Sequence, residues 1–170
     1  MAEGGARVAS FDQTGAEWDR VRAVNVKGVF FGAKHVIPHL RAAGKGSIIN
    51  LSSHAGLAGI GGIAPCRASK RAVRRMTRND AITCAAEKIR MNSIHPACIR
   101  TPMVENHLRA PATATAPDLE TAKAAAGAAH PIGSMGQADD IARAVVWRAS
   151  EKATFVTGAG IATDRGDTAR

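Results

Sequence analysis

The chain has 170 residues, of which 45% are apolar, enough for one domain with a hydrophobic core. It contains no apolar run of the roughly 20 residues that cross a bilayer, and its N-terminus lacks the features of a secretory signal. The three cysteines, Cys66, Cys84 and Cys98, are few and odd in number, which fits a reducing compartment better than a disulfide framework. We therefore expect a single cytoplasmic domain over residues 1–170 without a membrane partner.

A basic segment carries much of the formal net charge of +9. Its cations are Arg67, Lys70, Arg71, Arg74, Arg75 and Arg78. On a helix they fall within an arc of about 140°, which predicts an amphipathic helix with one basic face. This face is either solvated or a surface for an anion or a nucleic acid. No zinc-ligand spacing, aromatic stacking platform or nucleic-acid module accompanies it, so we expect no metal site and no nucleic-acid partner.

The first half of the chain alternates helical and strand patterns. Thr14 and Glu17 form a capping box, which predicts a long helix over residues 18–43 that ends at Gly44. The apolar, β-branched run 46–52 predicts a buried strand. A glycine-rich loop follows over residues 56–64, and Pro65 is well placed to open a helix that runs to about residue 88.

The second half continues the alternation. Residues 91–95 predict a short strand that ends at Pro96, and the alanine-rich segment 101–127 predicts a partly helical excursion. The last predicted elements are a helix over residues 139–150 and a strand over residues 154–163 that Gly158 and Gly160 interrupt. Helices that alternate with short apolar strands imply an α/β fold with a parallel sheet covered on both faces.

Ser53, Cys66 and Lys70 are the most informative residues, because they lie thirteen and then four positions apart. This spacing resembles the Ser…Tyr-x-x-x-Lys site of the short-chain dehydrogenases/reductases. Six fragments resemble the same family in the right order: residues 17–19, 24–30 around Asn25, 48–53, 68–70, 90–103 and 155–159. The resemblance covers nearly the whole chain but only the C-terminal two-thirds of the family fold. It implies a partial Rossmann-like three-layer αβα fold that lacks the N-terminal dinucleotide-binding strands.

The resemblance also implies an activity, which is NAD- or NADP-dependent hydride transfer between a small alcohol and a carbonyl. In the family the serine, here Ser53, holds the substrate oxygen, and the asparagine, here Asn25, holds a water of the proton relay. The lysine, here Lys70, lowers the pKa of the proton donor and binds the nicotinamide ribose. The nicotinamide loop adds Pro96, Ala97, Ile99 and Thr101 as cofactor-binding residues, and segment 102–130 corresponds to the substrate lid. The family forms homo-oligomers, but cations on the 67–78 face would repel across a two-fold axis.

Cys66 stands where the family has its proton-donating tyrosine, and the chain contains no tyrosine. A cysteine sulfur stops roughly 4–5 Å short of the phenol oxygen position, whereas a general acid must come within about 3 Å or act through a water. We therefore expect weak activity or none. Two interpretations of Cys66 stay open: a small inert residue in a disused site, or a reactive thiolate near Lys70 and a helix N-terminus.

Other departures from the family concern glycines. The sequence lacks the pattern of a strand, a glycine-rich turn and a helix that binds the pyrophosphate in this family. We therefore expect a truncated domain or a fragment that does not bind the nicotinamide cofactor tightly. Ala97 replaces a family glycine, and Arg165 replaces another, so Arg165 is expected to adopt a backbone geometry that favours glycine. An unpaired sheet edge should lie beside strand 48–52. The alternative function is a non-enzymatic binding module that uses the basic 67–78 face or this edge.

Overall fold

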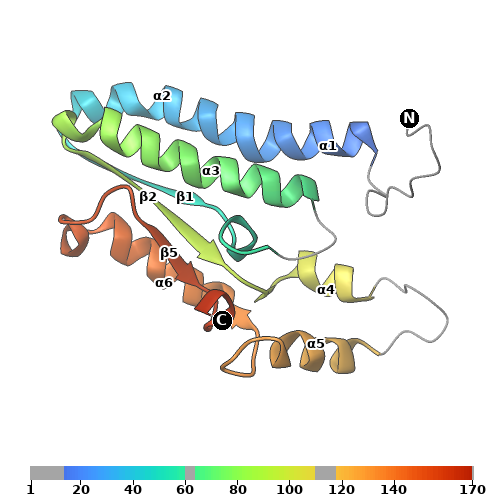
Figure 1. Cartoon of the computed structure of the whole chain (residues 1–170). Helices are drawn as coiled ribbons and strands as arrows, with labels where there is room; N and C mark the ends of the chain where they lie inside the picture. The colour runs from blue at the N-terminus through green and yellow to red at the C-terminus, as the bar shows by residue number, and fades with distance from the viewer. Residues whose placement is uncertain (1–13, 60–63, 110–117, 170) are drawn as a thin grey trace.

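A parallel three-stranded sheet lies at the centre of the molecule (Figure 1). The computed structural model describes residues 14–59, 64–109 and 118–169. The strands are β1 (Gly46–Leu51), β2 (Ile89–Pro96) and β5 (Gly160–Thr163), in the order β1-β2-β5. Ile48 pairs with Met91, and Ile94 pairs with Ile161. The parallel sheet confirms the predicted α/β class.

Helices cover both faces of this sheet, as the sequence predicts (Figure 1). α1 (Gly15–Arg22), the π-helical turn η1 (Ala23–Lys27) and α2 (Gly28–Ala42) follow one another on one face, next to α3 (Ala64–Thr83). α6 (Ala138–Ala149) covers the other face. Within the described residues, no helix is both long enough and apolar enough to span a membrane.

The helix starts follow from local chemistry, but two helix bounds differ from the prediction. The backbone N–H of Thr14 donates to the Glu17 carboxylate at 2.8 Å, and the Glu17 N–H donates to the Thr14 hydroxyl at 3.2 Å, which confirms the capping box. The first helix begins at Gly15 rather than residue 18, and a π-helical turn interrupts it. α3 ends at Thr83 rather than near residue 88, because the chain turns through Lys88, whose φ is 57°.

The hydrophobic core lies where α2 and α3 meet the sheet. α3 buries one residue per turn at a spacing of four, which places one stripe of the helix on β2. The members of this stripe are Pro65, Ser69, Val73, Thr77 and Ala81. The core adds Ala33, Cys84, Ile89 and Met91, with Ile37, Leu40 and Ile48 packed against them.

The C-terminal part departs most from the predicted elements. The last strand starts at Gly160 rather than residue 154, because residues before it turn through Gly158, whose φ is 69°. The 102–130 excursion contains α4 (Pro102–Arg109) and α5 (Leu119–Ala128), and residues 110–117 lie outside the described part. A two-residue parallel pair, β3 (Ile99–Arg100) with β4 (Gly136–Gln137), was not predicted. The remaining short turns are η2 (His54–Gly56), η3 (Ala85–Glu87), η4 (Glu151–Ala153) and η5 (Asp167–Ala169).

β1 forms one edge of the sheet, since among the described residues it pairs only with β2. Its end residues Gly46 and Ser52 donate their N–H groups to Lys88 and Ile94 on the β2 side, at 3.2 and 2.9 Å. Backbone groups alternate sides along a strand. The N–H groups of Ile48 and Asn50 therefore also face β2, while those of Ser47, Ile49 and Leu51 face the open edge.

Amide hydrogen exchange should show this alternation. In the dilute monomer we expect the amides of Ile49 and Leu51 to exchange at least about tenfold faster than those of Ile48 and Asn50, because only the latter are bonded within the sheet. Residue-resolved exchange by NMR measures it. Equal protection of all four amides would show that another segment or a second chain covers the edge.

Candidate active site

The C-terminal end of β1 is bonded to α3 through Ser52 and Lys70. The Ser52 hydroxyl donates to the Lys70 carbonyl at 2.8 Å, and the Lys70 ammonium donates to the Leu51 carbonyl at 3.0 Å. Gly56 packs on the same contact: a Cβ atom there would lie 2.9 Å from the Ser52 hydroxyl and 3.1 Å from the Lys70 carbonyl. Sequence reasoning missed Ser52, although its position next to Ser53 at a strand end was a possible signal. The contact fixes Lys70 at the C-terminal ends of the strands, which is where open α/β sheets bind ligands.

Asn25 is connected to Cys66 through Ser69. The Asn25 amide donates to the Ser69 hydroxyl at 3.0 Å, and this hydroxyl donates to the Cys66 carbonyl at 2.6 Å. Asn25 lies in the π-helical turn η1, a local geometry that is frequent at functional sites. Two separate sets of hydrogen bonds therefore meet the first turns of α3: one joins Asn25 to the backbone carbonyl of Cys66 through Ser69, and the other joins Lys70 to the end of β1.

Ser53 lies at the same end of the sheet, one residue beyond Ser52. Its hydroxyl accepts the N–H of Ala55 at 3.1 Å and donates to the Pro96 carbonyl at 3.4 Å. The structure thus brings the predicted serine next to Pro96, the first residue of the predicted nicotinamide loop. In this state the hydroxyl caps η2, and it must turn away from Pro96 to bond a substrate oxygen.

Lys70 is half-buried next to Cys66. The pKa of its ammonium is lowered because burial disfavours the charged form, and the neighbouring Cys66 sulfur opposes that shift. Cys66 itself is half-buried in the first turn of α3 and forms no disulfide.

The predicted nicotinamide loop leaves β2 at Pro96 and runs to α4. Ala97 is not strained, since Lys88 and Arg165 are the only non-glycine residues with positive φ in the part of the chain that the structure describes. Ile99 pairs with Gly136 in the β3–β4 bridge. The Thr101 hydroxyl accepts the N–H of Val104 at 3.4 Å, so Thr101 caps α4.

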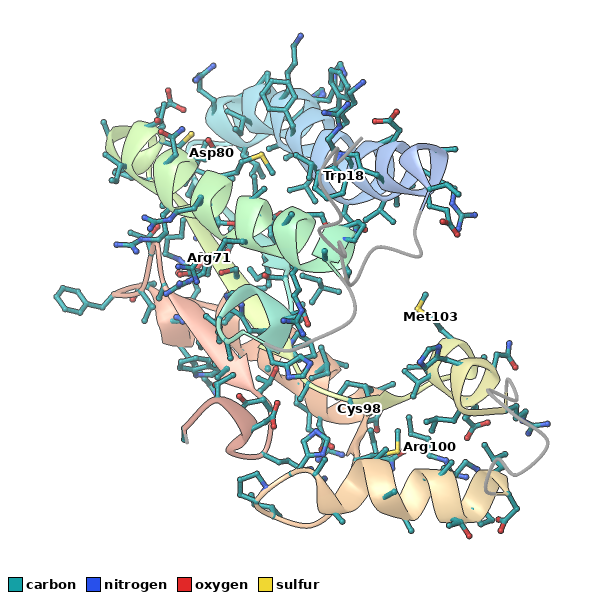
Figure 2. The ribbon with its side chains drawn as sticks, turned by 45° about the vertical axis from the view of Figure 1, so that its right-hand side comes forward. Trp18, Arg71, Asp80, Cys98, Arg100 and Met103 are labelled. Atoms are coloured by element: carbon teal, nitrogen blue, oxygen red, sulfur yellow. The ribbon has the colours of Figure 1, made fainter. Side chains whose placement is uncertain are left out.

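α4 and Arg165 border this loop. Met103 stands on the side of α4 that faces α1 and α3 and is 81% exposed (Figure 2). Arg165 has a φ of 52°, which confirms the expected glycine-like geometry. Its guanidinium contacts the Ser134 hydroxyl and lies 3.4 Å from the Asp140 carboxylate. These contacts hold the C-terminal segment on the start of α6.

The two histidines near the site have separate partners. His54 lies next to Ser53 in the sequence, yet its Nδ1 pairs with the Asp167 carboxylate at 2.5 Å. His95 is fully buried, with Nδ1 3.0 Å from the Ser53 carbonyl and Nε2 2.9 Å from the Ser93 hydroxyl. Because a carbonyl only accepts, Nδ1 carries the proton and Nε2 accepts from Ser93. Among the described residues, no group of three or more His, Cys, Asp or Glu side chains could hold a metal ion.

The buried His95 should make the fold sensitive to acid. Burial lowers its pKa below the ordinary value of 6.5. As the pH falls below about 6.5, the unfolded chain takes up a proton that the folded chain does not, so the free energy of unfolding decreases. The slope from this one group is at most about 1.4 kcal/mol per pH unit.

Urea unfolding between about pH 5 and pH 7 measures this slope. The variant His95→Gln should be less stable at every pH but should have the shallower slope, because its side chain does not titrate. Equal slopes in the two proteins would show that His95 does not produce the acid sensitivity.

The fold and this site define an α/β protein of the Rossmann type with polar side chains at the C-terminal edge of a parallel sheet. Comparison with known proteins identifies its family. The family model described as enoyl-(acyl carrier protein) reductase matches residues 2–168. The chain belongs to the short-chain dehydrogenase/reductase family.

Individual relatives agree with this assignment. Cyclopentanol dehydrogenase of Comamonas testosteroni is 40% identical over 158 residues, which are 93% of this chain and 60% of the relative. The NADP-dependent (R)-specific alcohol dehydrogenase of Lentilactobacillus kefiri is 37% identical over 164 residues, 94% of this chain and 60% of the relative. The crystal structure of levodione reductase superposes with a TM-score of 0.85 at 33% identity, covering 93% of this chain and 60% of that one. The chain thus spans about 60% of the length of the curated relatives it matches.

Proposed function

We propose that this chain carries the catalytic residues of an NAD(P)-dependent oxidoreductase acting on a small alcohol or carbonyl. The observation that supports this most directly is the pair of contacts at the start of α3: Lys70 is bonded to the end of β1, and Asn25 is bonded through Ser69 to the backbone at Cys66. Open α/β sheets bind their ligands at the C-terminal ends of the strands. The names of the relatives favour cyclic and secondary alcohols as the first substrates to test.

In this proposal each residue has a defined task, and Lys70 has two. Ser53 donates a hydrogen bond to the substrate oxygen, and Lys70 places a positive charge next to residue 66. Asn25 positions the start of α3 through Ser69. The nicotinamide cofactor would supply the hydride acceptor or donor; Lys70 and the loop formed by Pro96, Ala97, Ile99 and Thr101 are the residues that would hold it.

Two features support a low activity and a weak cofactor affinity for the 170-residue chain. A cysteine at position 66 is too short to reach the oxygen that a phenol would protonate. The described sheet contains β1, β2 and β5, whereas dinucleotide sites bind the pyrophosphate at a glycine-rich turn after a further strand.

A cofactor-dependent assay tests the proposed function. The chain is incubated with cyclopentanol and either NAD or NADP, and nicotinamide reduction is followed by its absorbance. We expect a slow rate that falls at least about tenfold in Ser53→Ala and in Lys70→Met, because each variant removes one group that acts on the reacting oxygen or its proton donor. His39→Gln, on the far end of α2, is the control and should keep the rate.

A separate binding measurement distinguishes cofactor affinity from catalytic turnover. Calorimetric titration with NADPH should give weak binding that Lys70→Met weakens further and that Ser53→Ala leaves unchanged. Tight NADPH binding with a rate unaffected by either substitution would reject the proposed site.

A further inference from the structure

Four arginines on α3 form a basic surface that the proposed catalysis does not use. We call Arg71, Arg74, Arg75 and Arg78 the arginine face. Arg71, Arg75 and Arg78 are exposed, and Arg74 is half-buried with an Nε that has no hydrogen-bond partner. Arg71 donates to the Gly56 carbonyl at 3.0 Å, which holds one guanidinium against η2; Figure 2 shows Arg71 on the side of α3 toward η2.

The arginine face has no internal counter-charge. None of its four members forms an ion pair within the described residues, and residues 67–78 contain no acidic side chain. The pKa of the Arg74 guanidinium is lowered first by burial and then by the charges of Arg71, Arg78 and Arg75. The four cations therefore repel one another, and bringing an anion to this surface relieves that repulsion.

Two exposed apolar side chains lie at the C-terminal end of the same surface. Ile82 follows Arg78 by one helical turn and is 80% exposed. Phe155 is fully exposed and lies in the loop before β5. This loop passes beside the end of α3, because a Cβ atom added at Gly158 would contact Ala81 at 3.6 Å. Apolar groups beside a line of cations fit a partner that presents both carboxylates and an aliphatic or aromatic side chain.

We propose that the arginine face, with Ile82 and Phe155, binds an acidic protein segment that carries an apolar anchor. The other classes of partner fit less well. A second copy related by a two-fold axis would place arginines against arginines. A membrane-lying helix needs a free apolar face, but α3 buries its apolar stripe against the sheet. A single-stranded nucleic acid uses several aromatic platforms, and Phe155 is the one exposed aromatic at this surface among the described residues.

The probe is a fluorescent peptide of about 16 residues, rich in glutamate with two leucines, long enough to span α3 from Arg71 to Ile82 at about 1.5 Å per residue. Fluorescence anisotropy with the full chain should show binding that weakens as NaCl rises from about 50 to about 300 mM. The double variant Arg75→Gln/Arg78→Gln should weaken binding about fivefold to thirtyfold, because two ion pairs are lost. The matched control Arg20→Gln/Arg22→Gln removes the same charge from α1 and should change the affinity less than twofold.

Two further probes identify the class of partner. An all-glutamate peptide of equal length should bind more weakly than the leucine-containing one, and Phe155→Ser should abolish that difference. A single-stranded oligonucleotide that binds as tightly as the leucine-containing peptide would overturn the proposal in favour of a nucleic acid. If the Arg20/Arg22 control loses as much binding as the Arg75/Arg78 variant, the binding comes from the net charge of the chain and the proposal is overturned. If the chain dimerises and the Arg75/Arg78 variant does not, the arginine face is a self-association surface instead.

Discussion

Replacing Cys66 by tyrosine is expected to raise the rate of the proposed alcohol oxidation by about 10²-fold or more. A positioned general acid or base contributes about 10²–10⁴ to the rate, and a phenol at position 66 reaches the oxygen that a thiol cannot. Lys70, four residues further along α3, lies on the same helical face and would favour the phenolate. The nicotinamide affinity should stay unchanged, since residue 66 acts on the substrate oxygen.

The phenylalanine variant is the matched control for this prediction. Cys66→Phe fills the same space but has no hydroxyl, so its rate should stay at or below that of the unaltered chain. Adding Lys70→Met to Cys66→Tyr should remove most of the gain. Equal rates for the tyrosine and phenylalanine variants would show that the effect comes from packing and not from proton transfer.

Replacing Arg148 by leucine is expected to stabilise the fold by about 1–3 kcal/mol, because a buried charge without full pairing is costly. Arg148 lies on α6 and is only 2% exposed. Its Nε and Nη1 atoms have no hydrogen-bond partner, and burial together with the nearby Arg90 lowers the pKa of its guanidinium. The guanidinium carbon lies 5.2 Å from the centroid of the Trp147 ring, and this cation–π contact offsets only part of the free-energy cost of burying the charge.

Urea unfolding at pH 7 measures the effect of Arg148→Leu. The control is Arg143→Leu on the same helix, where the side chain is 77% exposed and the expected change is within about 0.5 kcal/mol. A loss of stability in Arg148→Leu would show that the guanidinium has partners in solution, such as water or an anion, that offset its burial.

Most of the secondary structure could be predicted, because capping and hydrophobic periodicity are local. The capping box at Thr14 and Glu17 fixes the first helix start, and the β-branched run before Ser52 forms the expected strand. The prediction was wrong at residues 154–159, where β propensity suggested a strand. There the backbone turns through Gly158, whose φ is 69°. The Asn92 amide donates to the Val156 carbonyl, and backbone bonds to β2 begin only at Gly158 and Ala159.

The sequence by itself determined the family and the candidate residues Asn25, Ser53, Cys66 and Lys70, because spacing and residue type are properties of the chain. The tertiary structure decided how these residues are held. The bond from Asn25 joins residues 44 positions apart, and the bond from Ser52 joins residues 18 positions apart. Such contacts depend on how α3 packs on β1 and η1, which no local pattern encodes. The burial of Arg148 was decided in the same way, since the helical period of α6 is compatible with an exposed or a buried arginine.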